Sequence, residues 1–177
     1  MTAFEDEELA RFGEQDEKLS KTKKRAMNVL SARQLTRAAM EKRLIELGET
    51  SENAADAADW LVEIGLINDA EYAAELVRGC VRRGFGARRI RDELYKRRVP
   101  RELWDDALAE IEDGETVASA VAFIERKLRG DAPDFDDKRK IGAALARRGH
   151  SWSDINAAFA EYAENLDLDL EKEFDFE

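Results

Sequence analysis

The densest group of side chains that could bind a ligand is the basic block VRGCVRRGFGARRIRDELYKRRVPR, residues 77–101. Between residues 78 and 101 it holds ten Lys or Arg residues and two acids. Guanidinium groups present planar pairs of donors that suit phosphate and carboxylate acceptors. The plainer interpretation is a solvated helix face paired with acidic helices of neighbouring units. So large a local excess cannot be neutralised within the block, and we therefore expect it to contact an anionic surface.

Helical spacing sorts the side chains of this block. On a helix that follows Gly86, Ile90 and Leu94 face the core while the cations project away. The candidate partner-binding residues are Arg78, Arg82, Arg83, Arg88, Arg89, Arg91, Lys96, Arg97 and Arg98. We expect a secondary basic surface from Lys42, Arg43, Arg139, Lys140, Arg147 and Arg148.

Other chemistries find little support in the residue types. The segment Gly84-Phe85-Gly86 lacks the preceding strand and the third glycine of a dinucleotide-binding loop, so we predict an inter-helix turn. Cys80 and His150 are the only residues of their kinds, which leaves no zinc site and no Cys–His nucleophile. Pairs of neighbouring carboxylates are expected by chance in a chain with 40 acidic residues, so they do not indicate a metal-dependent active site. We therefore predict no catalytic residues, no metal and no cofactor.

A repeat of about 50 residues positions these groups. Five sets of apolar residues recur at offsets of 50 and 51: Met40/Ile90/Ile141, Leu44/Leu94/Leu145, Ala54/Trp104/Ile155, Ala57/Ala107/Ala158 and Leu61/Ile111/Tyr162. Such units bury their apolar faces by stacking on their neighbours. The predicted fold class is all-α, with three tandem three-helix repeats stacked into an elongated, curved array.

Turn and cap signals set the boundaries. We predict a disordered acidic N-terminal tail at 1–23, repeats at 24–67, 68–113 and 114–163, and an acidic C-terminal tail at 164–177. Thr36 and Ser51 are expected helix N-caps, and Asn68 with Glu71 a capping box. The last helix should place Trp152 on its apolar side. Before the C-terminal tail, which alternates apolar and acidic residues, no segment shows sustained alternation of period two, so we expect no sheet.

Composition indicates where such a protein works. The single cysteine excludes an internal disulfide and favours a reducing cytoplasm, and no uncharged run is long enough to span a membrane. The net charge of −11 argues against a simple nucleic-acid-binding protein. That average hides segregation, because residues 18–43 and 78–101 are each +8. We expect a monomer whose basic surface is confined to one side.

A run of positions in the second repeat suggests a family. They are Gly65, Leu66, Ile67, Asp69, Tyr72, Ala73, Val77, Arg78, Gly84, Gly86, Arg89, Ile90 and Leu94. With them, the stretch 61–94 resembles the RecX regulatory proteins of bacteria. The first repeat resembles the opening of that family at Arg33, Thr36, Lys42, Leu44 and Gly48. The resemblance covers residues 24–163, and Gly79-Cys80 and the acidic tails depart from it.

The resemblance implies a function that the residues alone do not. Proteins of this family are non-catalytic, usually inhibitory modulators of the RecA recombinase. They lie in the groove of the RecA–DNA filament, which implies a role in DNA repair, DNA recombination and the SOS response. The residues also leave open a direct DNA-binding protein with helix-turn-helix-like units, and a metal-dependent nuclease.

Overall fold

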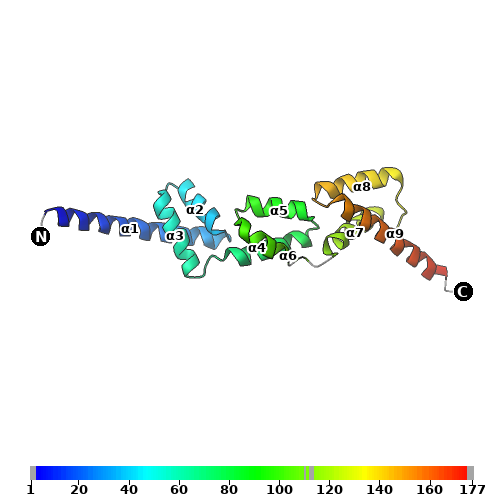
Figure 1. The fold of residues 1–177 in the computed structure, drawn as a ribbon, viewed down its shortest axis with the longest axis horizontal. Coiled ribbons are helices and arrows are strands. Elements are labelled where there is room, and N and C mark those ends of the chain that lie inside the picture. The colour runs from blue at the N-terminus through cyan, green and yellow to red at the C-terminus, as the bar shows by residue number, and fades with distance from the viewer. Residues whose placement is uncertain (1–2, 110, 112–113, 175–177) are drawn as a thin grey trace. The chain divides into compact units, whose positions relative to one another are not determined.

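The structure is a computed structural model that describes residues 3–109, 111 and 114–174, with side chains from residue 14 to residue 166 within those ranges. Its elements are α1 Ala3–Ala32, α2 Arg37–Glu46, α3 Ser51–Glu63, α4 Asp69–Arg82, α5 Ala87–Lys96, the 3₁₀ turn η1 Arg101–Leu103, α6 Trp104–Ala109, α7 Glu115–Leu128, α8 Phe135–Arg147 and α9 Trp152–Phe174 (Figure 1). The described part of the chain contains no strand. The predicted all-α fold of three-helix repeats is confirmed, with α1–α3, α4–α6 and α7–α9 as the repeats.

The chain divides into two compact units. Unit 1 comprises Met1–Tyr72 and Arg97–Pro100, and unit 2 comprises Ala73–Lys96 and Arg101–Glu177. Repeat 3 therefore belongs wholly to unit 2, together with most of repeat 2. None of the described helices is long and apolar enough to cross a membrane.

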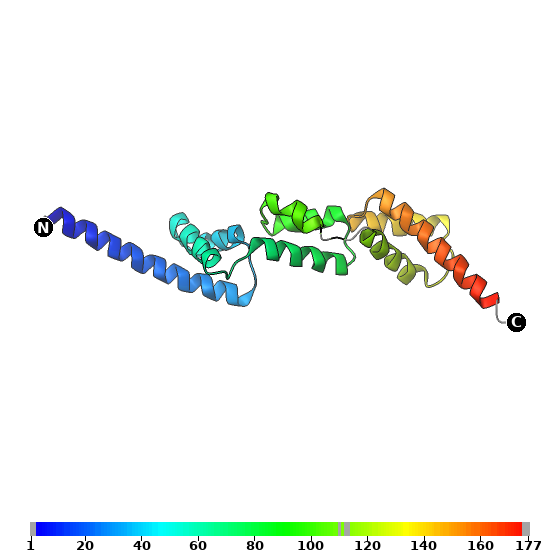
Figure 2. The same ribbon diagram turned by 60° about the horizontal axis from the view of Figure 1, so that its bottom comes forward.

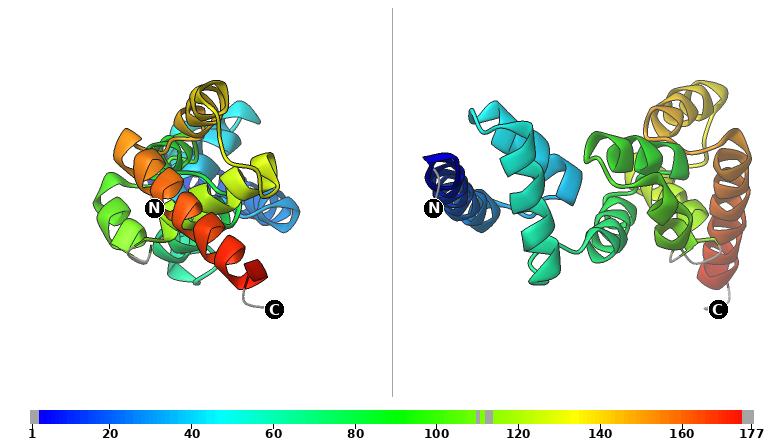
Figure 3. Two further views of the ribbon diagram at one scale, coloured as in Figure 1. Left: turned by 90° about the vertical axis from the view of Figure 1, so that its right-hand side faces the viewer. Right: turned by 60° about the vertical axis from the view of Figure 1, so that its left-hand side comes forward.

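Unit 1 is built on α1, against which α2 and α3 pack (Figure 3, right). Its core includes the fully buried side chains of Met40, Leu44 and Leu61. Thr36 is also fully buried, and its hydroxyl both accepts a hydrogen bond from the backbone N–H of Ala39 (3.2 Å) and donates one to the carbonyl of Arg97 (2.9 Å). One threonine therefore caps α2 and holds the segment Arg97–Pro100 in unit 1.

Unit 2 contains a second, separate core. In repeat 3, α7 lies along α9 (Figure 2), and the side chains of Ile124, Leu145 and Ile155 are buried between the helices. In repeat 2, Ile90 and Leu94 of α5 are fully buried. Because their cores share no residue, the cores around α2–α3 and α7–α9 are each complete within one unit.

The five apolar triads occupy the core as the repeat predicts. Thirteen of the fifteen residues are buried, and the other two, Trp104 and Ile111, are partly buried. Thr36 and Asn68 accept the capping hydrogen bonds expected of them. The cap of α3 differs, because Thr50 has the extended backbone of an N-cap and accepts from the N–H of Asn53, whereas Ser51 is the first helical residue.

The predicted tail boundaries differ from the helix ends. Helix α1 runs through residue 23, and within it Thr22 is fully buried, with its hydroxyl donating to Glu49 (2.7 Å). Arg25 pairs with the same carboxylate at 2.6 Å, so Glu49 gives this part of α1 a polar partner. At the other end, α9 continues past residue 163 to Phe174. Residues 1–2 and 175–177 of the predicted tails lie outside the described residues.

Candidate functional site

The basic block spans the last turn of α4, the glycine turn and α5. Helix α4 ends in a Schellman motif, in which Gly84 donates to Val81 and Phe85 to Cys80. Helix α5 then starts at Ala87, and Ile90 and Leu94 anchor its apolar side. As predicted from the spacing, Arg88 and Lys96 are exposed; Arg89 is half-buried.

Repeats 2 and 3 meet at a joint formed by two glycines, Gly86 and Gly149. The carbonyls of Arg148 and Gly149, left open at the end of α8, accept hydrogen bonds from the backbone N–H groups of Gly86 (3.0 Å) and Arg88 (3.2 Å). Carbonyl groups that follow α8 thereby accept hydrogen bonds from backbone N–H groups at the start of α5, which have no partner within their own helix. A Cβ at either glycine would overlap the backbone of the facing segment. We call this contact, with Arg148 and His150, the repeat 2–3 joint.

Arg148 is part of this joint. Its Nε donates to the carbonyl of Gly84 at 3.0 Å, and its Nη2 donates to the carbonyl of Arg83. The guanidinium also lies over two aromatic rings, at 5.4 Å from the centre of Phe85 and 5.2 Å from that of Phe123. The sequence predicts Arg148 for the secondary basic surface, and in the structure its donors face the protein.

His150 lies beside Arg148 and is buried. Its Nε2 is 3.3 Å from the carbonyl of Gly84, and its buried Nδ1 has no hydrogen-bond partner in the described residues. Burial lowers the pKa of His150 below its ordinary value, and Arg148 adds to this, whereas the Gly84 carbonyl and Asp154 oppose it. The lowered pKa favours the neutral imidazole, and a hydrogen bond to the Gly84 carbonyl requires the proton on Nε2.

The other predicted cations form two groups: those whose side chains already interact within the protein, and those whose side chains do not. Arg83 bonds to the carbonyl of Gly79 and lies over Phe85, while Arg89 and Lys96 both approach Glu93, at 3.1 and 3.5 Å. Ion pairs also engage Lys42 and Arg43 with Glu46, and Arg139 with Asp136. Arg97 bonds to the hydroxyl of Tyr72, and Arg78 also interacts within the protein. Among the predicted cations, five in unit 2 are exposed and have side chains without a hydrogen-bond or ion-pair partner in the described residues: Arg82, Arg88, Arg91, Lys140 and Arg147. In unit 1, Arg98 is also exposed, and its side chain has no hydrogen-bond or ion-pair partner among the described residues.

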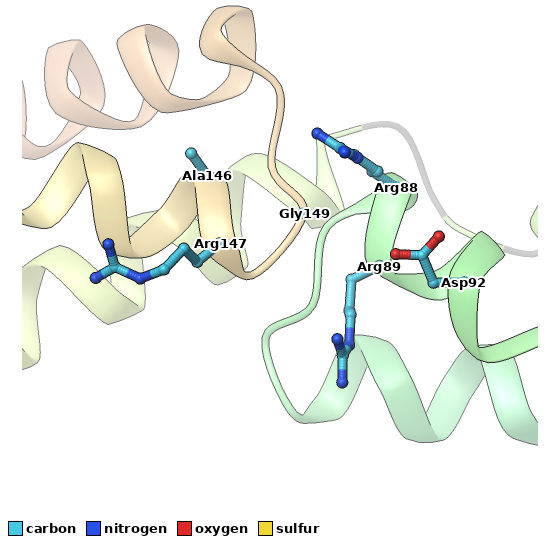
Figure 4. Close-up of a pocket in the computed structure, with 6 residues that line it drawn as sticks. All are labelled: Arg88, Arg89, Asp92, Ala146, Arg147 and Gly149. Atoms are coloured by element: carbon cyan, nitrogen blue, oxygen red, sulfur yellow. The ribbon is translucent and has the colours of Figure 1, made fainter. Parts of the chain in front are cut away.

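A cleft of about 370 Å³ lies next to the joint, lined by Arg88, Arg89, Asp92, Ala146, Arg147 and Gly149. Figure 4 shows the guanidiniums of Arg88, Arg89 and Arg147 pointing away from one another. They do not form a cradle for a single phosphate. The arrangement instead spreads positive charge over both sides of the joint, which suits an extended anionic surface.

Unit 1 holds a polar group that sequence reasoning missed. The guanidinium of Arg37 bonds to both carboxylate oxygens of Asp59, at 2.7 and 3.0 Å, and to Glu41 at 2.6 Å, while its backbone N–H donates to Asp69 at 2.8 Å. The bond from Arg37 lowers the pKa of Asp59, whereas burial raises the pKa of Asp69. All these partners belong to unit 1, so the group ties the start of α2 to α3 and to Asp69. The cap signal at Thr36 placed Arg37 at the helix start but could not reveal its partners.

The described residues contain no group of three or more His, Cys, Asp or Glu side chains that could hold a metal ion. Cys80 is buried, with Arg83 at 3.1 Å from its sulfur. The site thus consists of arginines and of the joint that positions them.

Comparison with known proteins gives this arrangement a family. Residues 68–108 match the model of the second three-helix domain of RecX, and residues 113–159 match that of the third. The chain is 35% identical over 134 residues to the regulatory protein RecX of Mycolicibacterium vanbaalenii, covering 71% of this chain and 73% of that protein. The chain belongs to the RecX family. Its RecX relative from Trichlorobacter lovleyi is 33% identical over 130 residues, covering 71% and 84% of the two chains.

Solved RecX structures have the same fold. The crystal structure of RecX from Lactobacillus salivarius superposes with a TM-score of 0.74 at 27% identity, over 84% of this chain and 98% of that one. The second and third of the repeats predicted from the apolar triads therefore correspond to the second and third three-helix domains of RecX. The relatives are named as regulatory proteins, which supports a regulatory role for this RecX family member.

Proposed function

We propose that this protein binds the filament that RecA forms on DNA and inhibits the ATPase, recombinase and coprotease activities of RecA. It acts without catalysing a reaction and without a cofactor, as a monomer in the cytoplasm, within DNA repair, DNA recombination and the SOS response. Membership of the RecX family supports the regulatory part of this proposal.

The observation that carries the proposal is the set of uncompensated arginines in unit 2. Arg88 and Arg91 on α5 and Arg147 at the end of α8 are exposed and lack an internal side-chain partner among the described residues. In a protein of net charge −11, exposed cations are expected to pair with the abundant carboxylates. Guanidiniums left unpaired in such a chain are available to acceptors on a partner.

Charge-matched variants test this surface. The triple variant Arg88→Gln/Arg91→Gln/Arg147→Gln should inhibit the RecA ATPase at higher protein concentrations than the wild type. The control Lys24→Gln/Arg33→Gln/Lys138→Gln removes the same charge from exposed residues without internal partners among the described residues. It should inhibit as the wild type does. Equal inhibition by both folded variants would show that this surface is not the one that binds.

Direct binding to naked DNA is the second candidate, favoured by the same arginines. It predicts that the protein binds single- or double-stranded DNA without RecA, and that the logarithm of affinity falls steeply with that of salt concentration. Each lost phosphate contact should reduce that slope by about 0.7 on a single strand. Tight binding to naked DNA, unchanged when RecA is added, would favour this candidate over the filament.

A further inference from the structure

Repeats 2 and 3 are connected by contacts that no local sequence pattern specifies. Gly86 and Gly149 are far apart in the chain, yet the end of α8 is hydrogen-bonded to the start of α5 through Gly86 N–H and Arg88 N–H. Gly149 has φ +91°, which only glycine adopts without strain, and both glycines are in contact with facing backbone. Neither position tolerates a side chain while the joint is closed.

We propose that Arg148 is a positioning residue, which closes the repeat 2–3 joint and so fixes Arg88 and Arg147 relative to each other. The cleft residues Arg88 and Arg147 belong to different repeats. Without the joint, α5 and α8 would be linked only through the intervening helices. Arg148 thus acts on the partner surface through the two exposed arginines, and not by touching the partner.

The chemistry of the contact explains why arginine stands there. The carbonyls of Arg83 and Gly84 follow the last residue of α4, where the helix dipole favours a positive charge. One planar guanidinium reaches both carbonyls and stacks on Phe85 and Phe123 at the same time. A lysine keeps the charge but offers a single nitrogen, which cannot reproduce that fork.

This difference separates positioning from surface charge. If Arg148 served the partner by its charge, Arg148→Lys would behave as the wild type. If it closes the joint, Arg148→Lys should open it although the net charge is unchanged. Gly86→Ala offers an independent route, because it removes no charge and forces a Cβ against the backbone of Gly149. Gly79→Ala is the matched control, since a Cβ at Gly79 meets only the end of the Arg82 side chain at 3.7 Å.

The joint is measured in the free protein by pulsed electron spin resonance. Spin labels are attached at Tyr95→Cys on α5 and Phe135→Cys on α8, which are 70% and 82% exposed; Cys80 is fully buried and stays unlabelled. We expect a narrow distance distribution for the wild type and Gly79→Ala, and a broad one for Arg148→Lys and Gly86→Ala, at unchanged helical circular dichroism. A narrow distribution in Arg148→Lys, or a broad one in the wild type, would overturn the proposal.

A second arm connects the joint to the partner, and only this arm depends on the proposed function. Gly86→Ala and Arg148→Lys should both lose inhibition of RecA, whereas Gly79→Ala should keep it. If the spin labels show an open joint and inhibition is unchanged, the joint does not position the surface. If the wild type itself fails to inhibit RecA, the proposed function fails while the distance measurement stands.

Discussion

The cores of the two units can be tested separately at equivalent repeat positions. Leu44 in unit 1 and Leu145 in unit 2 belong to the same apolar triad, and both are fully buried. Each belongs to a cluster that shares no residue with the other. Replacing either leucine with alanine removes three buried carbon atoms and leaves a cavity among close-packed neighbours.

The expected cost follows from this burial. A fully buried Leu→Ala substitution destabilises a core by about 2–5 kcal/mol, the sum of lost transfer free energy and the cavity. That is a large share of the stability of a small domain. We therefore expect Leu145→Ala to lower the protection of repeat 3 amides against hydrogen exchange by about 30-fold or more, since 1.4 kcal/mol corresponds to tenfold.

Hydrogen exchange followed by mass spectrometry locates the loss along the chain. Leu145→Ala should expose α7–α9 and leave α2 and α3 protected, and Leu44→Ala should do the reverse. Ile45→Ala, at a residue that is 44% exposed, is the control and should change protection little. Equal loss of protection in both units from either substitution would refute the independence of the two cores.

Three further outcomes follow from single contacts. Thr36→Ala should lower stability by about 2 kcal/mol, because it removes a cap and a buried hydrogen bond, against about 1 kcal/mol for the exposed cap variant Thr50→Ala; urea unfolding compares them. Burial lowers the pKa of His150 in the folded protein, so the stability of unit 2 should be greatest above the unfolded pKa of about 6.5 and should fall as the pH drops below that value. Thermal unfolding at several pH values measures this fall, and His150→Gln should reduce it. Asp59→Asn should change stability by less than about 1 kcal/mol, because its pair with Arg37 is partly exposed, and a loss above about 2 kcal/mol would contradict this.

The apolar repeat made the fold predictable. Core positions such as Leu44, Leu94 and Leu145 recur at a fixed spacing, because each repeat buries the same face, and a periodic signal of that kind survives in the sequence alone. Local chemistry likewise predicted the cap at Thr36. Trp152 was expected on the apolar side of the last helix but is 64% exposed, since it is the first residue of α9 and lies at the edge of the core.

The candidate site was predictable only in part. The excess of arginine marked residues 78–101 as a candidate, but composition cannot say which guanidiniums the protein itself engages. Arg148 counts toward a basic surface in the sequence, yet its donors bond to the carbonyls of Arg83 and Gly84. That contact depends on the approach of Gly86 to Gly149, a tertiary feature with no periodic or local signal.

The most direct test of the proposed function is co-sedimentation of this protein with RecA assembled on single-stranded DNA, compared with RecA alone and with DNA alone. Binding to the filament should require the assembled complex and should weaken in Arg88→Gln/Arg91→Gln/Arg147→Gln, while the charge-matched control sediments as the wild type does. Sedimentation with DNA alone to the same extent, or none with the filament, would contradict the proposal that this RecX family member acts on the RecA filament.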